Sequence, residues 1–382
     1  MFKLSTSVLH RYEIFEICNE LNKLNVLETL YSTYPKFEIL KYNIPKSKIK
    51  SYVIYELLSR TNDYFWSKNF YFSKLDLKIC DLFDNRISKL NHGNIDIFYG
   101  NGGMCLQTFR KIKNKTMKVF HSASMHIATK KRLLIDIGYN ANEIVNPLME
   151  NKYLSEIEIA DYVVCTSDHT YDSYLENGIN ESKLILNHSG IDVNRFFYEE
   201  KEEINDGKFR FLFVGNFSLR KGGLKLIEAY KKIRNRNTEL IIAGTIDFTL
   251  KNQIKNYENY DDIRFIGKIK NKDLYKIYSK CHLLCLLASE EGFAKVLGEA
   301  MACGLPLLCS KNSGGSYFIR EKSHGAVIEN LELANIADMM KSFLDKIDLI
   351  KNNKFNLSNY AKKNFSWEVS VKKLTEKLSS KL

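Results

Sequence analysis

The fold is decided by residues 209–223, which read FRFLFVGNFSLRKGG. The first six residues form an apolar run broken by one arginine, which is typical of a short buried strand. Gly215 then opens a loop that closes at a pair of glycines, and a helical stretch follows at 224–235. A strand, a glycine-containing loop and a helix in this order begin a βαβ unit and therefore predict a parallel sheet.

The same alternation continues after this first unit. Short apolar runs end at glycine or lead into loops, and stretches with helical spacing separate them. Right-handed crossovers would place these strands side by side in one sheet. The predicted strands are 240–243, 263–266, 283–287 and 306–308, and the predicted helices are 271–280 and 294–302.

The first half of the chain is less regular. It predicts strands at 95–99, 118–120 and 162–165 and a helix at 12–25, and a polar, turn-forming stretch at 191–208 is the best linker. We expect an α/β protein with two facing Rossmann-like domains, parallel sheets and a ligand in the cleft between them. The expected domains are 1–195 and 196–365, and the amphipathic helix 366–382 is expected to pack back across them.

Length and composition exclude several classes of protein. The chain has 382 residues, of which 45% are hydrophobic and 27% charged, so a disordered or fibrous chain is excluded. No apolar run approaches the ~20 residues that a membrane span needs, and the first residues lack a long apolar leader segment. Eight scattered cysteines without a C-x-x-C pair predict reduced, buried thiols and a cytoplasmic protein.

The net charge of +12 is unevenly distributed. Residues 1–132 hold 22 basic and 11 acidic residues, 133–200 hold 3 and 13, and 201–382 hold 32 and 21. Two basic regions could face anions such as nucleotides or phospholipid headgroups, or they could simply be a solvated surface rich in lysine. No function follows for the acidic stretch.

The most informative stretch for chemistry is 288–306, ASEEGFAKVLGEAMACGLP. Glu291 follows a predicted strand, Gly292 allows a tight turn, and a helix is expected to begin near Phe293 or Ala294. The free N–H groups and the dipole of that helix would favour an anion, and Glu299 would point back along the same side. A capping acid followed by a surface glutamate explains the spacing equally well.

A second stretch could bind phosphate. Gly215 would let a ligand approach the backbone, and Arg220 and Lys221 would supply positive charge just before Gly222. The spacing is neither that of a Walker loop nor G-x-G-x-x-G, so a nicotinamide dinucleotide is disfavoured. Without further context, a strand–turn–helix with solvated cations remains the alternative.

Together the two stretches resemble the retaining glycosyltransferases of family 4, which have the GT-B fold, and in particular the bacterial surface-polysaccharide type. Residues 291–306 match the family's E-x7-E signature, and 215–222 match its glycine and (R/K)-K-G loop. The resemblance covers most of 187–330. It is weaker in the first half, at 10–12, 34–36, 122–127, 160–167 and 188–192.

The resemblance implies roles for individual residues. Glu291 would bind hydroxyls of the donor sugar, Glu299 the ribose, and Lys221 with Arg220 the diphosphate as it leaves. His126, from the other domain, would hydrogen-bond the donor sugar. The implied catalytic residues are His126, Glu291 and Lys221; the implied donor-binding residues are Gly215, Asn216, Arg220, Lys221, Gly222, Glu291, Gly292, Phe293, Ala294 and Glu299; the implied acceptor contacts are His10 and Arg11.

Two positions depart from the family pattern. Asn216 stands where many relatives have arginine, so one phosphate-binding cation is either missing or replaced by Arg220, and Ala294 stands where glycine is usual. The sequence has no Asp-x-Asp triplet of the kind that binds metal in the other large glycosyltransferase fold. No metal and no cofactor are therefore predicted.

The implied activity is that of a metal-independent, retaining hexosyltransferase. It would move a sugar from a UDP- or GDP-sugar to a hydroxyl of a glycan or lipid-linked acceptor. The reaction would belong to the biosynthesis of lipopolysaccharide or another surface polysaccharide. The protein would lie in the cytoplasm or peripherally at the anionic inner face of the membrane. A catalytically silent GT-B protein that only binds sugar nucleotides is one alternative. A nucleic-acid binder is another, but no aromatic residues interleave with the cations as that function requires.

Overall fold

The computed structural model describes residues 2–11, 13–66, 74–140, 144–204, 206–257 and 259–382. The chain divides into two compact units. The first holds residues 1–166, 170–187 and 370–382, and the second holds 167–169 and 188–369. Both units are Rossmann-like, with helices packed around a parallel sheet.

Within its described residues, the first unit has one seven-stranded sheet of order β3-β2-β1-β4-β5-β6-β7. All of its strand pairs are parallel. The order runs outward from β1 in both directions, so the chain reverses between β1 and β4. The strands are β1 (Leu4–Val8), β2 (Leu27–Ser32), β3 (Ile49–Ser51), β4 (Ile97–Asn101), β5 (Met117–Ser122), β6 (Tyr162–Cys165) and β7 (Leu184–Leu186).

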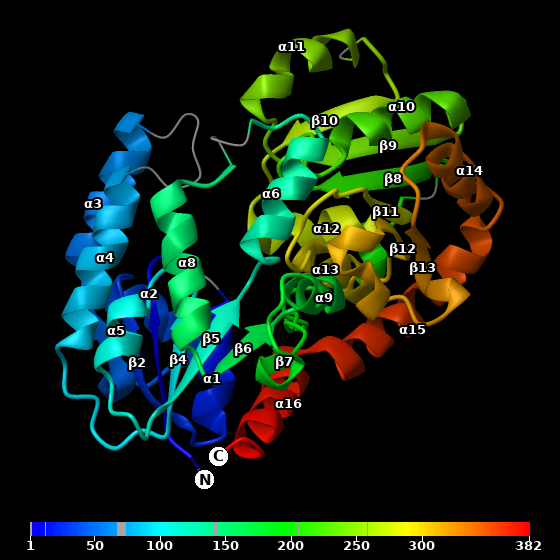
Figure 1. The fold of residues 1–382 in the computed structure, drawn as a ribbon. Coiled ribbons are helices and arrows are strands. Elements are labelled where there is room, and N and C mark those ends of the chain that lie inside the picture. Colours follow the sequence, from blue (N-terminus) through cyan, green and yellow to red (C-terminus); the bar gives the residue numbers. More distant parts are fainter. Residues whose placement is uncertain (1, 12, 67–73, 141–143, 205, 258) are drawn as a thin grey trace. The chain divides into compact units, whose positions relative to one another are not determined.

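Helices connect these strands as crossovers, as parallel pairing requires. Helix α3 packs on α4, α4 on α5 and α5 on α8 (Figure 1). The helices are α1 (Ile14–Lys23), α2 (Lys36–Ile39), α3 (Val53–Trp66), α4 (Lys74–Ser88), α5 (Leu106–Lys111), α6 (Ile127–Asp136), α8 (Pro147–Ile159) and α9 (Asp168–Glu176).

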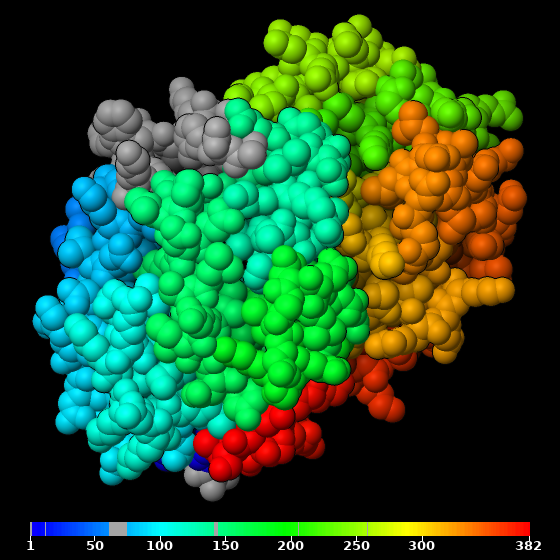
Figure 2. All heavy atoms as spheres, in the orientation of Figure 1, coloured from blue at the N-terminus to red at the C-terminus, as the bar shows by residue number. Residues whose placement is uncertain are grey.

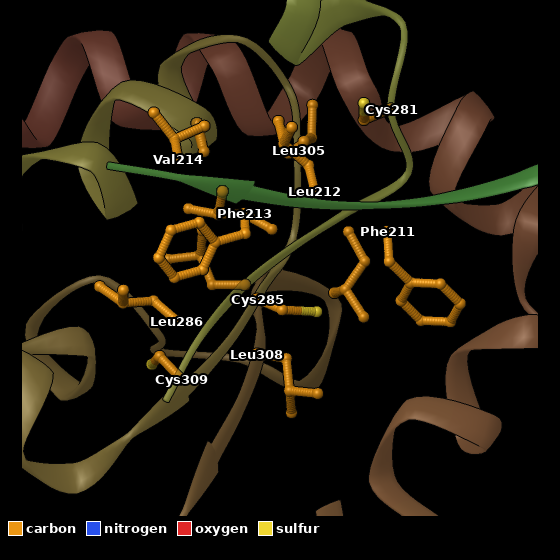
Figure 3. Packing of buried hydrophobic residues seen from close by; sticks show 14 of the residues in the cluster. Phe211, Leu212, Phe213, Val214, Cys281, Cys285, Leu286, Leu305, Leu308 and Cys309 are labelled. Carbon is orange, nitrogen blue, oxygen red and sulfur yellow. The ribbon is translucent and has the colours of Figure 1, made fainter. Parts of the chain in front are cut away.

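The described part of the second unit has a six-stranded parallel sheet of order β10-β9-β8-β11-β12-β13. Strand β8 lies in the interior of this sheet and is buried on both faces, so its sequence is almost wholly apolar. Figure 3 shows Phe211 and Phe213 on one side of β8 and Leu212 and Val214 on the other. The strands are β8 (Phe209–Val214), β9 (Thr238–Ala243), β10 (Ile263–Gly267), β11 (Leu283–Leu286), β12 (Leu307–Ser310) and β13 (Gly325–Ile328).

In this sheet the strand order reverses between β8 and β11. Ligands of open parallel sheets bind beside the carboxyl ends of the strands at such a reversal. Helix α10 packs on α14, and α13 packs on α15 (Figure 1). The helices are α10 (Gly223–Ile233), α11 (Lys251–Ile254), α12 (Leu274–Ser279), α13 (Lys295–Ala302), α14 (Leu333–Leu344) and α15 (Ile347–Phe365).

The unit boundaries differ from the expected 195/196. The second unit begins at His188, because residues 188–195 already contact it: the Ile191 N–H donates to the Phe365 carbonyl at 2.8 Å. The last helix, α16 (Trp367–Ser379), ends in the first unit. Its Lys377 ammonium donates to the Leu186 carbonyl, and the red tail atoms lie beside the green atoms near residue 180 in Figure 2. The tail from Ser370 onward thus completes the first unit.

All eight cysteines are free and buried, as their scattered placement predicted. Among the helices that the structure describes, none is both long enough and apolar enough to span a membrane.

Candidate functional site

The floor of the candidate site is made by two loops that follow β8 and β9. Gly215 has φ of 134° and Gly244 has φ of 146°, a backbone region that favours glycine. A Cβ atom at Gly244 would lie 1.8 Å from the Gly215 carbonyl oxygen. The two loops therefore touch backbone to backbone, and a ligand could approach the main chain closely here.

The turn before α10 brings two cations to the end of β11. Gly222 has φ of 70°, and a Cβ there would lie 2.2 Å from the Leu287 carbonyl oxygen. The Arg220 carbonyl accepts a hydrogen bond of 2.8 Å from the Ser289 N–H. These contacts hold the 218–222 turn against the loop that carries Glu290 and Glu291.

Two cations and two carboxylates meet at this point. Lys221 Nζ lies 2.8 Å from Glu291 Oε2, and Arg220 Nη1 lies 3.4 Å from the same oxygen. Arg220 Nη1 also donates to the carbonyl of Glu290 at 2.9 Å and lies 3.3 Å from its Oε2. The four formal charges cancel, and each cation has a carboxylate partner. An arriving diphosphate would have to compete with Glu291 for Lys221.

Glu290 was not among the residues that the sequence singled out. Its side chain is only 2% exposed, whereas that of Glu291 is 18% exposed. The neighbouring Glu290–Glu291 pair could have suggested that one carboxylate anchors Arg220 while the other faces a ligand. Only the tertiary structure shows that Glu290 is the more buried of the two.

Glu299 lies on α13 and has its own surroundings. Tyr278 donates from its hydroxyl to Glu299 Oε2 at 3.2 Å. Burial raises the pKa of Glu299, and the nearby Lys295 opposes this. A carboxylate beside a tyrosine hydroxyl and a lysine can accept hydrogen bonds from a diol such as that of ribose.

The start of α13 differs from the expectation. The helix begins at Lys295, not at Phe293 or Ala294. The Ala294 N–H donates to the Ser313 carbonyl at 3.2 Å, so this group is already used by the loop before β13. The Ala294 N–H would have to leave the Ser313 carbonyl to hold a phosphate, and its role on the donor stays a prediction. Of the other predicted donor residues, Asn216 accepts from Thr245 Oγ1 at 3.0 Å.

His126 lies in the first unit, at the N-cap of α6. Its N–H donates to Ser173 Oγ at 2.9 Å, and its Nδ1 accepts from the Ala128 N–H at 3.4 Å. Burial lowers its pKa, so the ring is neutral at neutral pH. The ring meets Tyr174 edge to face at 5.3 Å between centroids. A role on the donor sugar stays a prediction.

His10 and Arg11 follow β1, at the carboxyl end of the interior strand of the first sheet. His10 is held with φ of 63°, which is uncommon for a residue with a side chain. Its Nδ1 lies 3.0 Å from Glu56 Oε2 and its Nε2 lies 3.1 Å from Ser59 Oγ. Arg11 lies over the ring of Tyr42, 5.4 Å from the centroid. A role of His10 and Arg11 in binding an acceptor stays a prediction.

Across the part of the chain that the structure describes, no group of three or more His, Cys, Asp or Glu side chains is placed to hold a metal ion.

Sequence comparison finds relatives of the second unit in particular. Residues 194–364 match the family model of the glycosyl transferases group 1. An uncharacterized glycosyltransferase of Methanocaldococcus jannaschii is 24% identical over 357 residues, covering 89% of this chain and 85% of the relative. For two other curated relatives the match spans only 60% and 61% of their own length.

Solved structures of similar shape cover both units. HepE of Anabaena, in complex with UDP and glucose, has a TM-score of 0.64 and 14% identity, with 100% of each chain covered. WaaG, a glycosyltransferase involved in lipopolysaccharide biosynthesis, has a TM-score of 0.67 and 15% identity, with 97% of this chain and 98% of WaaG covered. At such low identity the likeness establishes the fold, which is GT-B.

Proposed function

We propose that this chain, whose residues 194–364 match the family model of the glycosyl transferases group 1, moves a sugar from a nucleoside-diphosphate donor to an acceptor hydroxyl with retention of configuration. The observation that carries the proposal is the cluster of Lys221, Arg220 and Glu291 at the strand reversal of the second sheet. Cations and a carboxylate within one hydrogen-bond length of each other suit a ligand that carries both phosphates and hydroxyls.

The cations would do most of the chemical work. Negative charge develops on the diphosphate as its bond to the sugar breaks, and fixed positive charge at that place lowers the barrier. Lys221 and Arg220 would supply this charge without a metal ion. Glu291 would accept hydrogen bonds from sugar hydroxyls, and Glu299 would accept them from the ribose.

The donor that we propose to test first is a UDP-sugar. The structurally similar HepE of Anabaena was solved in complex with UDP and glucose. The acceptor that we propose is a surface glycan or its lipid-linked precursor, because WaaG, which shares the fold, is described as acting in lipopolysaccharide biosynthesis.

To reach a membrane-bound acceptor, this protein would have to dock peripherally on the bilayer. In the first unit, Phe37, Ile54 and Leu57 have side chains 66%, 59% and 56% exposed, and lysines stand in the same stretch of sequence. Apolar and cationic groups together bind anionic lipid surfaces. Ile54→Asp should reduce sedimentation with anionic liposomes, and equal sedimentation of wild type with neutral and anionic liposomes would contradict the docking.

The function is tested by donor-dependent release of nucleoside diphosphate. Thermal shift against UDP-, GDP- and ADP-sugars selects the donor, and product release is then measured with the best one. Glu291→Ala and Lys221→Ala should each abolish most of the release. Lys225→Ala is the matched control, since this lysine is exposed and lies four residues after Lys221, in α10. Stabilisation by a donor without any turnover would indicate a catalytically silent binding protein instead.

A further inference from the structure

The tripeptide Ser167-Asp168-His169 lies at the start of α9. Strand β6 before it and the rest of α9 after it belong to the first unit, but these three residues belong to the second. Asp168 Oδ2 lies 2.8 Å from Nε2 of His188, which is also in the second unit. The tripeptide is thus fixed in the second unit by its own side chains.

The two outer residues of the tripeptide bind consecutive carbonyls of the loop that carries Glu291. Ser167 Oγ donates to the Gly292 carbonyl at 2.6 Å. His169 Nε2 lies 2.5 Å from the Glu291 carbonyl. A carbonyl oxygen only accepts, so Nε2 must carry the hydrogen.

The imidazole of His169 is held in one tautomer. Burial lowers its pKa, so the ring is neutral at neutral pH and Nδ1 carries no hydrogen. Nδ1 is buried and has no hydrogen-bond partner among the described residues. The ring therefore makes its one strong polar contact to the backbone of Glu291.

Packing fixes the ring position as well. Gly314 has φ of 81°, and a Cβ there would lie 3.4 Å from His169 Cε1 and 3.6 Å from both Ser167 Cβ and Phe293 Cδ2. Side chains from the tripeptide and from the Glu291 loop thus close around the same glycine turn. Neither side chain can swing away without opening that packing.

We propose that Ser167 and His169 are positioning residues that fix the backbone of Glu291 and Gly292, and thereby aim the Glu291 carboxylate at Lys221. The proposal rests on the proposed function of Glu291. A functional carboxylate must be held within about 0.5 Å of its working position, and hydrogen bonds to its own backbone are the means of doing so. Losing either bond would leave Glu291 present but loosely placed.

The first experiment measures loop order without any substrate. Hydrogen–deuterium exchange of a peptide covering 289–294 reports on the amide of Ala294, which is protected by Ser313. His169→Leu removes the donor, and Ser167→Ala removes the hydroxyl. Each should speed exchange in this peptide about tenfold, as expected for the loss of one hydrogen bond. Asp172→Ala, an exposed change on the same helix, is the matched control and should leave exchange unchanged.

The second experiment measures how the same variants use the donor. His169→Leu should lower kcat/KM for the donor sugar nucleotide about tenfold while the Kd for UDP alone stays near the wild-type value, because Lys221 and Arg220 are untouched. His169→Gln places an amide N–H at a similar reach and should restore much of kcat/KM. If His169 had only a general packing role, His169→Gln would not restore kcat/KM, and His169→Leu would also change the Kd for UDP.

The outcomes separate the two proposals. If wild type binds no sugar nucleotide but His169→Leu still speeds exchange at 289–294, the proposed function fails and the positioning role stands. If His169→Leu and Ser167→Ala are folded and leave both exchange and kcat/KM unchanged, the positioning role is overturned. If His169→Leu does not fold, Ser167→Ala and His169→Gln test the positioning role through the same two measurements, exchange at 289–294 and kcat/KM.

Discussion

Replacing Glu291 by glutamine should tighten the binding of UDP while destroying turnover. The Glu291 carboxylate lies 2.8 Å from Lys221 Nζ and 3.4 Å from Arg220 Nη1. A diphosphate needs the same cations, so the carboxylate competes with it and repels it. Glutamine keeps the shape of the side chain but removes the charge.

The magnitude follows from the ion pair. Both side chains are mostly buried, with 13% of Lys221 and 18% of Glu291 exposed, so the pair is only partly screened by water. A hydrogen bond between charged groups at such a place contributes about 1.5–3 kcal/mol. Every 1.4 kcal/mol is a factor of about ten in Kd. If the diphosphate gains only the lower part of this range, UDP should bind Glu291→Gln about tenfold more tightly.

The assay is calorimetric titration of wild type and Glu291→Gln with UDP and with the donor sugar nucleotide. On the proposed function, wild type should prefer the complete donor, because Glu291 would bind the sugar hydroxyls once the diphosphate has taken Lys221. The variant should prefer UDP. Glu332→Gln, an exposed carboxylate before α14, is the control and should change neither affinity. The gain for UDP should shrink at high salt, since screening weakens the competing charge.

One result would refute this reasoning. If Glu291→Gln binds UDP no more tightly than wild type, and its melting temperature shows that it is folded, then Lys221 is not released to the diphosphate. The 2.8 Å pair would then be a structural contact, and Glu291 would have to be removed from the donor site.

Four further predictions concern the donor site and the fold. Lys221→Ala should weaken UDP binding at least about tenfold in the same titration, because a charged partner of the diphosphate is lost. Gly244→Ala should lower the free energy of unfolding by about 1–3 kcal/mol in denaturant titration, since its Cβ would meet the Gly215 carbonyl, and a wild-type value would contradict the loop contact. The pKa of Glu56 is lowered to about 2, because hydrogen bonds from His10, Arg60 and Thr33 outweigh the effect of its burial. The stability that this carboxylate contributes, about 3 kcal/mol, should be complete above pH 4.5 and should be lost as the pH falls toward 2. In Glu56→Gln the free energy of unfolding should not show this loss. Glu156 accepts hydrogen bonds from the backbone N–H groups of residues 103, 105 and 106. Glu156→Gln should lower the melting temperature, because the buried amide NH2 of glutamine would face one of these N–H donors. An unchanged melting curve would show that these hydrogen bonds contribute little.

Most of the second unit could be predicted from the sequence. The strand expected at 209–214 has the same bounds in β8, and the other expected strands lie within two or three residues of β9 to β12. Strands of a parallel sheet are buried on both faces, so they appear in the sequence as short apolar runs between glycine loops. The regular spacing of such runs was enough to predict the architecture.

The first unit shows where this reasoning fails. Strand β1, at Leu4–Val8, reads LSTSV and was not predicted, although all five residues are buried. One of its polar side chains is paired within the fold: Thr6 Oγ1 donates to the Tyr99 carbonyl at 2.6 Å. The strands at 27–32, 49–51 and 184–186 were missed as well, because they are interrupted by polar residues or are only three residues long.

The sequence by itself determined which residues carry charge and where the glycine loops fall, because these depend on neighbours along the chain. That was enough to place Lys221 and Glu291 in one candidate site. Only the tertiary structure decided that Glu290 anchors Arg220, that Ala294 has no free N–H, and that Ser167 and His169 bind the Glu291 loop. The last contact joins residues 122 positions apart, and its partners are backbone carbonyls, which every residue possesses and no sequence pattern marks.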